Sequence, residues 1–292
     1  IRDETDKPFV VSWVAAPEAG IAALRELGIC TLRGGEPTID AIAALVEYGR
    51  AQKRWQADAA ARATIELPEV RLPAASGPVP TVEAARLLEA ADVPLAGVRL
   101  CTTAEEAVAA ADAFGYPVVM KIESPDILHK TEADGVEVGL ADADAVSTAI
   151  ARIMANAPVY DADARISGVV VQEMEAGTVE LVVGLRQDPV FGMVLMVGLG
   201  GILVEIQKDV VFHRAPVTED QALGMLERLK GAKLLDGVRG KPAVDRTKLA
   251  QVIATVSRFG AAAQGRLAEL DLNPVLAGPD GAVAIDWLMV AE

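Results

Sequence analysis

The feature that most constrains the fold is a series of short apolar segments between residues 168 and 215. Five of these segments follow one another with only a few residues between neighbours, so no crossover helix fits between them. We expect strands at 168–174, 179–185, 192–197, 202–206 and 210–215. Earlier in the chain, expected strands at 97–101 and 117–122 flank a helix at 103–114. This strand–helix–strand beginning followed by a strand-rich half predicts an α+β fold rather than a doubly wound parallel sheet.

The first part of the chain has a different order of elements. We expect strands at 9–14 and 29–32 and helices at 17–27 and 36–55. Such an alternation predicts a parallel sheet, and two strands are too few to form one alone. Residues 1–57 are therefore predicted to be the end of an α/β domain, and the start at Ile1 rather than methionine is typical of a fragment or a processed product. Residues 58–76, first Ala-rich and then Pro-rich, are predicted to be a linker, with a second domain at 77–292.

The charge balance limits the class of partner. The chain has 27 basic and 42 acidic residues and a net charge of −15, which argues against nucleic acid and against an anionic membrane surface. An anionic ligand would therefore need a locally arranged site. The hydrophobic content of 52% excludes a disordered chain. The longest uncharged run, residues 189–204, is too short and too rich in glycine to span a membrane.

The two cysteines indicate a compartment rather than a site. Cys30 and Cys101 have neither zinc-binding nor disulfide spacing, so we interpret them as small buried hydrophobic residues. Free thiols of this kind are typical of a reducing, cytoplasmic location.

Lys121 is the first candidate functional residue. It lies in an expected strand, shares a face with Val119, and has the apolar neighbours Met120 and Ile122. An ammonium group in such surroundings is costly unless it binds an anion. The alternative is a lysine on an edge strand whose ammonium reaches solvent. The residues alone leave both interpretations open.

A polar segment at residues 124–134 follows this strand directly. It carries His129, one of two histidines in the chain. A neutral imidazole can accept a phosphoryl group or act as a base. A loop histidine can equally be solvated and without function, and the residues alone leave this open. For His213, which lies in an expected strand, we predict a structural role.

The common phosphate-binding loops are absent from the sequence, which contains neither GxxxxGK(S/T) nor GxGxxG. Three glycines nevertheless lie between two expected strands: Gly198, Gly200 and Gly201. Glycines at such a place allow close approach of the backbone to a ligand, and consecutive N–H groups can hold a phosphate. A tight turn is the alternative interpretation.

Oxygen-bearing side chains alternate with leucines at residues 269–274. They are Glu269, Asp271 and Asn273, and their spacing puts them on one face of a strand. A turn at 278–281 reverses the chain, so antiparallel pairing would bring Asp286 beside Asp271 and Asn273. Clustered carboxylates repel one another, and a hard cation such as Mg²⁺ relieves that repulsion. The alternative is a solvated hairpin face, but such a face more often includes Lys, Thr or Arg, so we favour a metal site.

Together these features resemble the ATP-grasp domain of the ADP-forming acyl-CoA synthetases, relatives of succinyl-CoA synthetase. The matching strings are PVVMKIESPDILHKTEADGVEVGL, VVVQEMEAGTVELVVGLRQDPVFGMVLMVGLGGILVEI and ELDLNPV, in the family's order. The resemblance covers residues 77–292 and implies an ATP-grasp fold, in which two α+β subdomains grip ATP. Residues 1–57 resemble the end of the family's flavodoxin-like ligase domain. The family's CoA-binding domain is expected upstream or on another chain.

The resemblance also implies roles for individual residues. Lys121 would grip the nucleotide phosphates, and His129, in an HK(S/T) segment with Lys130 and Thr131, would relay a phosphoryl group. The other implied nucleotide-binding residues are Gln172, Glu173 and Met174 at a hinge over the adenine, Glu180 near the ribose, Arg186 beside the phosphates, and Gly200 and Gly201 in a flexible cover. The implied magnesium ligands are Asp271, Asn273 and Asp286, with Glu205 as a further candidate.

The implied activity is that of a ligase of the EC 6.2.1 type, which converts an acid, CoA and ATP to acyl-CoA, ADP and phosphate through an acyl phosphate and a phosphohistidine. This chain would bind ATP or ADP and Mg²⁺, and CoA would bind mainly to a domain outside it, in an oligomeric enzyme. The sequence leaves the identity of the acid substrate open: it could be acetate, an aryl acid, a hydroxycinnamate such as ferulate, or a dicarboxylate. It also leaves open the choice between ATP and GTP. One alternative is another ATP-grasp carboxylate ligase, which needs no relay histidine. The other is a nucleotide-sensing module of an acetyltransferase-type fusion protein.

Overall fold

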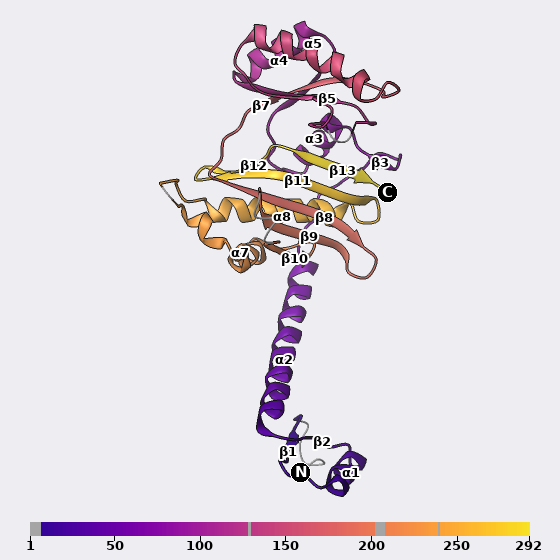
Figure 1. Cartoon of the computed structure of the whole chain (residues 1–292), viewed down its shortest axis with the longest axis vertical. Coiled ribbons are helices and arrows are strands. Elements are labelled where there is room, and N and C mark those ends of the chain that lie inside the picture. The colour runs from indigo at the N-terminus through magenta and orange to yellow at the C-terminus, as the bar shows by residue number, and fades with distance from the viewer. Residues whose placement is uncertain (1–6, 128–129, 202–207, 239) are drawn as a thin grey trace. The chain divides into compact units, whose positions relative to one another are not determined.

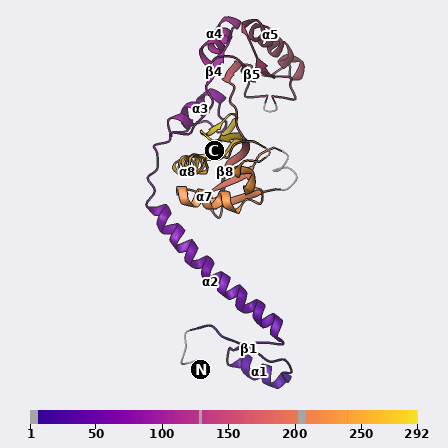
Figure 2. The same ribbon diagram turned by 90° about the vertical axis from the view of Figure 1, so that its left-hand side faces the viewer.

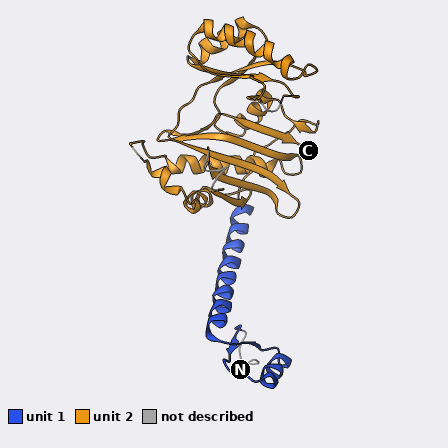
Figure 3. Ribbon diagram, viewed as in Figure 1, with its two compact units in different colours: residues 1–64 blue, residues 65–292 orange. Residues whose placement is uncertain are grey.

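The computed structural model describes residues 7–127, 130–201, 208–238 and 240–292. The chain divides into two compact units, residues 1–64 and residues 65–292 (Figure 3). Among the helices of the described residues, none has both the length and the apolar character needed to cross a bilayer.

The first unit has the β-α-β-α order that the sequence predicts. Strands β1 (Val10–Ser12) and β2 (Cys30–Leu32) pair in parallel, and helix α1 (Glu18–Glu26) connects them. Helix α2 (Gly35–Ala63) extends beyond the expected end at residue 55 into the predicted linker. The reason is local, because the added residues are rich in alanine, the residue with the highest helix propensity.

The second unit contains a four-stranded antiparallel sheet in the order β4-β7-β5-β6. Its strands are β4 (Val98–Cys101), β5 (Val118–Glu123), β6 (Val136–Leu140) and β7 (Gly168–Glu173). Helices α4 (Ala104–Phe114) and α5 (Ala143–Tyr160) cover one face of this sheet (Figure 1). Met120 and Ile122 of β5 point into the resulting core, which leaves Val119 and Lys121 on the other face.

A larger antiparallel sheet forms the rest of this unit, in the order β10-β9-β8-β11-β13-β3 with β12 paired to β11. Its strands are β3 (Gly77–Pro78), β8 (Val179–Asp188), β9 (Gly192–Leu199), β10 (Val210–Arg214), β11 (Leu267–Gly278), β12 (Gly281–Ala284) and β13 (Trp287–Ala291). Helices α7 (Glu219–Arg228) and α8 (Arg246–Ala262) pack on one face (Figure 1, Figure 2). Helix α3 (Thr81–Glu89) and the 3₁₀ helix η2 (Ala232–Asp236) complete the unit.

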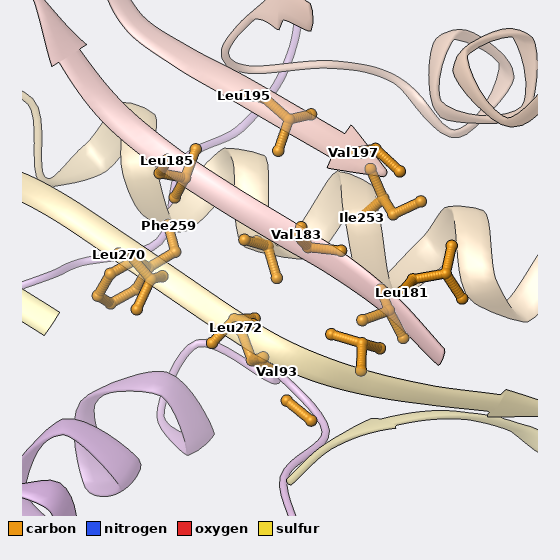
Figure 4. Packing of buried hydrophobic residues seen from close by; sticks show 14 of the residues in the cluster. Val93, Leu181, Val183, Leu185, Leu195, Val197, Ile253, Phe259, Leu270 and Leu272 are labelled. Atoms are coloured by element: carbon orange, nitrogen blue, oxygen red, sulfur yellow. The ribbon is translucent and has the colours of Figure 1, made fainter. Parts of the chain in front are cut away.

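Alternation along the strands directs one set of side chains toward α8. Leu181, Val183 and Leu185 of β8 pack with Ile253 and Phe259 of the helix (Figure 4). The same cluster also contains Leu195, Val197, Leu270 and Leu272. The even-numbered residues of β8 and the odd-numbered residues 269–273 of β11 therefore lie on the opposite face, away from the helices.

The C-terminal strands differ in detail from the prediction. Strand β11 continues past Asn273 to Gly278, with a shift of register between Leu272 and Val275. The returning chain forms two strands, because Ile285 and Asp286 separate β12 from β13. The strand expected at 202–206 lies outside the described residues.

Candidate functional site

A cavity of about 630 Å³ lies in the second unit, between the two sheets. Its walls come from the start of α3, from β5 and the segment after it, and from β11 and the residues just before β13. The polar residues that line it include Thr81, Lys121, Lys130, Asp271, Asn273 and Asp286. Three of these residues are predicted metal ligands and one is the predicted phosphate-binding lysine, so this cavity is the candidate site.

Lys121 reaches across this cavity from the smaller sheet. Its side chain is 13% exposed, and its Nζ lies 3.3 Å from Asp286 Oδ1. The same ammonium donates to the carbonyl oxygen of Ile285 at 3.3 Å. Burial lowers the pKa of Lys121, the carboxylate of Asp286 opposes this shift, and the charge of Lys130 adds to it. Because β5 lies between β7 and β6, the interpretation as a lysine on an edge strand is wrong.

The predicted metal ligands come together as the strand pattern indicates. Asn273 donates its backbone N–H to the carbonyl of Asp286 at 3.1 Å, and Asp286 Oδ1 accepts from the backbone N–H of Trp287 at 3.1 Å. Burial raises the pKa of Asp271, and the charges of Glu269 and Asp286 raise it further, while a hydrogen bond with Asn273 opposes the shift. An excess of negative charge at a half-buried carboxyl is what a hard cation would relieve, so these residues fit Mg²⁺.

A metal bound there would need ligands besides carboxylates. In the part of the chain that the structure describes, no group of three or more His, Cys, Asp or Glu residues is arranged to hold a metal ion. Asp271 and Asp286 supply two carboxylates, and Asn273 supplies an amide oxygen. Phosphate oxygens commonly complete the coordination of Mg²⁺ in nucleotide sites.

The predicted hinge residues lie near this cavity but do not line it. Gln172 is buried, and its Nε2 donates to the carbonyl of Ile285 at 2.6 Å, the same oxygen that Lys121 contacts. Glu173 accepts from the backbone N–H of Gly97 at 3.4 Å, and Met174 is 45% exposed.

The glycines after β9 approach the larger sheet closely. Gly200 donates its N–H to the carbonyl of Glu180 at 2.7 Å, and a Cβ built on Gly200 would lie 3.0 Å from Glu180. Gly201 has a φ of +65°, in the left-handed region that favours glycine. These contacts place the two glycines beside Glu180. Arg186 pairs in register with Glu269 on the face away from α8 and does not line the cavity.

Two predicted residues, His129 and Glu205, lie outside the described residues. The residues around His129 are informative, however, because Ile127, Lys130, Thr131 and Glu132 all line the cavity.

The sequence interpretation missed one buried acid of the site. Glu123, at the end of β5, is 6% exposed and accepts hydrogen bonds from the backbone N–H and the hydroxyl of Thr81, both at 2.7 Å. Its Oε2 also lies 3.3 Å from Lys130 Nζ. The available signal was a charged residue that directly follows the apolar core of a strand.

A second cavity, of about 810 Å³, lies between α8, the β11–β12 hairpin and the residues that precede β8. None of the predicted site residues that the structure describes lines it, and Lys248 within it donates to the carbonyl of Asp280 at 2.9 Å. The smaller cavity is therefore kept as the candidate site.

A comparison with known protein families identifies the domain that contains this cavity. The model of the ATP-grasp domain matches residues 74–290, which include both sheets and the cavity. The chain belongs to the ATP-grasp family. Its ATP-grasp domain is similar to those of the ADP-forming acyl-CoA ligases. The acetate–CoA ligase (ADP-forming) I subunit beta of Pyrococcus furiosus is 39% identical over 213 residues, which cover 73% of this chain and 91% of that subunit.

Two further comparisons agree. Trans-feruloyl-CoA synthase FCS1 from an unknown prokaryotic organism is 37% identical over 294 residues, which cover 98% of this chain and 40% of that enzyme. A structure of Ca. Korarchaeum cryptofilum acetyl-coenzyme A synthetase 1, in complex with coenzyme A and Ca-AMPCP, has 36% identity and a TM-score of 0.71, and the match covers 74% of this chain and 94% of that one. Among its longer relatives the chain spans from 27% to 40% of their length.

Proposed function

We propose that this chain is the ATP-binding, phosphoryl-transferring part of an ADP-forming acid–CoA ligase. The observation that carries the proposal is the cavity in which Lys121 faces Asp271, Asn273 and Asp286, within an ATP-grasp domain that is similar to those of acyl-CoA ligases. A cation and oxygen ligands that face one another across a cavity suit the phosphates of a nucleotide and their metal.

The residues of the chain would act mainly by position and charge. Lys121 would hold the phosphates, for which it would exchange its contact with Asp286. Asp271, Asn273 and Asp286 would hold Mg²⁺, which when bound neutralises charge on the phosphates. Phosphoryl transfer depends chiefly on such positioning and electrostatic stabilisation.

We assign the nucleoside part of the ligand to residues near the cavity. The adenine would lie along Gln172, Glu173 and Met174, the ribose near Glu180, and Gly200 and Gly201 would cover the ligand. Support comes from the close contact of Gly200 with Glu180 and from the cross-sheet hydrogen bond of Gln172. Arg186 is assigned to the phosphates and Glu205 to the metal on the family resemblance alone.

His129 is proposed to relay the phosphoryl group. One imidazole nitrogen, unprotonated, would attack the phosphorus of the incoming phosphohistidine, so that an N–P bond forms and the first N–P bond breaks. An oxygen of the terminal phosphate of ADP would then take the phosphoryl group, and His129 would be released. The residues that flank His129 line the cavity, which supports this role.

The acid and the CoA site would lie outside this chain. Relatives that match the same region are named as ligases of acetate, 4-hydroxybutyrate and ferulate, so this part of the enzyme is compatible with different acids. The CoA-binding domain would lie upstream or on another chain, as the separate beta subunit of Pyrococcus furiosus illustrates.

The test is replacement of His129 by alanine in the complete enzyme. We expect acyl-CoA synthesis to fall by at least about 10³-fold, while ADP still binds with its original affinity. His213→Ala is the matched control, because it removes the other histidine of the chain, and activity should stay within about threefold of wild type. Full activity of the His129→Ala enzyme would show that the relay is wrong.

A further inference from the structure

Glu123 is a buried carboxylate that the proposed reaction does not use. It ends β5, two residues after Lys121, and its side chain is 8% exposed. Oε1 accepts the backbone N–H of Thr81, and Oε2 accepts the hydroxyl of the same residue. Thr81 begins α3, and its carbonyl accepts the indole N–H of Trp287 at 2.9 Å. Glu123 thus joins the smaller sheet to a helix that is itself tied to the larger sheet.

The third partner of Glu123 is the ammonium group of Lys130. Lys130 Nζ lies 3.3 Å from Glu123 Oε2 and 3.2 Å from Thr81 Oγ1, and its side chain is 23% exposed. An ammonium group has three N–H donors, and these two acceptors take two of them. Because Lys130 lines the cavity, the third donor is available to a ligand there.

The described lining of the cavity has two cationic side chains, Lys121 and Lys130. They are held on different walls, because Lys121 contacts Asp286 and Ile285 whereas Lys130 contacts Glu123 and Thr81. The same lining contains the carboxylates of Glu123, Glu132, Asp271 and Asp286. A nucleoside diphosphate carries several negative charges, so a single ammonium group among these carboxylates is a poor match for it.

We infer that Glu123 is a positioning residue that holds Lys130 as a second cation for the phosphates of the nucleotide. This inference rests on the proposed function, because it takes a nucleotide as the occupant of the cavity. A free lysine side chain loses rotamer entropy when it binds a ligand. Glu123 and Thr81 hold the ammonium in place before the ligand arrives, which lowers that cost.

The test measures the affinity of the chain for ADP and for AMP by titration calorimetry. Lys130→Met should raise the Kd for ADP about tenfold, the loss of one charge-assisted hydrogen bond, and should change the Kd for AMP by less than about threefold. Lys130→Arg should restore most of the ADP affinity. Lys248→Met removes a lysine that lies outside this cavity and donates to a backbone carbonyl, and it should leave both constants unchanged.

A double-mutant cycle separates positioning by Glu123 from a simple effect of its charge. Glu123→Gln should raise the Kd for ADP about threefold in the wild-type background and should have no further effect in the Lys130→Met background. Tighter ADP binding by Glu123→Gln, or equal effects in both backgrounds, would contradict the inference. Thr81→Val, which removes the shared hydroxyl, provides the same comparison if Glu123→Gln fails to fold.

The outcomes also distinguish the two proposals. Failure of the wild-type chain to bind ADP would overturn the proposed function itself. Wild-type binding of ADP that Lys130→Met leaves unchanged would overturn only the role of Lys130 and Glu123.

Discussion

Lys121 illustrates how one residue can be costly for the fold and useful for the site. Its ammonium group is largely buried, which disfavours the charged form, and the contacts with Asp286 and Ile285 offset part of that cost. Both contacts come from the segment between β12 and β13, which contains the predicted metal ligand Asp286. The contacts favour the charged form of the ammonium at the place where phosphates are proposed to bind.

This arrangement predicts a pH dependence of nucleotide binding. Because burial lowers the pKa of Lys121, the ammonium loses its proton at a lower pH than an ordinary lysine does. The affinity for ADP should therefore begin to fall at a lower pH than it would with an ordinary lysine, by about tenfold once the amine is neutral. Titration calorimetry between about pH 7.5 and 10 checks this prediction. The upper end of this pH range lies near the pKa of an ordinary lysine.

Lys121→Arg is the control for this prediction, because a guanidinium stays protonated over the whole range. Its ADP affinity should be weaker than that of the wild type near neutral pH and nearly independent of pH above it. An equal decline in both proteins would assign the pH dependence to another group.

At the scale of elements, α8 and β8 approach each other closely at one glycine. A Cβ built on Gly260 would lie 2.6 Å from Leu185 Cδ1, and Gly260 itself is buried. Gly224 in α7 offers the opposite case, because a Cβ built there meets no described atom within 4 Å. Two helical glycines thus differ only in what packs against them.

These two glycines predict opposite effects of alanine on stability. Gly260→Ala should lower the free energy of unfolding by about 1–3 kcal/mol, because Leu185 has to move in a filled core. Gly224→Ala should raise it by about 0.5–1 kcal/mol, because alanine has the higher helix propensity and no contact is disturbed. Urea denaturation measures both, and destabilisation by Gly224→Ala would show that the helix packs differently there.

At the scale of the whole molecule, the cores lie in one unit. Both clusters of buried hydrophobic residues belong to residues 65–292, whereas residues 7–64 contain no buried hydrophobic side chain. The first unit has only two paired strands among its described residues, and it exposes Trp13 and Trp55 at 39% and 57%. A two-stranded sheet of this kind is marginal by itself in water.

A fragment of residues 65–292 should therefore fold without the first unit. We expect a cooperative unfolding transition and a Kd for ADP within about twofold of the whole chain, because the cavity and both cores are retained. Circular dichroism and calorimetry check this, with residues 7–64 alone as the comparison, which should lack a cooperative transition. Aggregation of the 65–292 fragment would mean that its core depends on residues of the first unit.

Local patterns in the sequence determined much of this protein. The crowded apolar segments predicted the antiparallel strands, and the alternation at residues 269–273 predicted which face Asp271 and Asn273 occupy. At the start of α7, Thr218 and Gln221 form a capping box, a contact between residues only three positions apart. Such patterns succeed because they depend on the period of a strand or on contacts between residues close in the chain.

Tertiary structure alone decided which of these faces meet. Lys121 and Asp286 come from different sheets, and the pairing order that makes β5 an interior strand is not encoded in the period of β5 itself. The two hydrogen bonds that the Ile285 carbonyl accepts and the contacts of Glu123 with Thr81 and Lys130 likewise depend on long-range packing. The physical reason is that periodicity reports the side of an element on which a residue lies, whereas the identity of its neighbour depends on how distant elements pack.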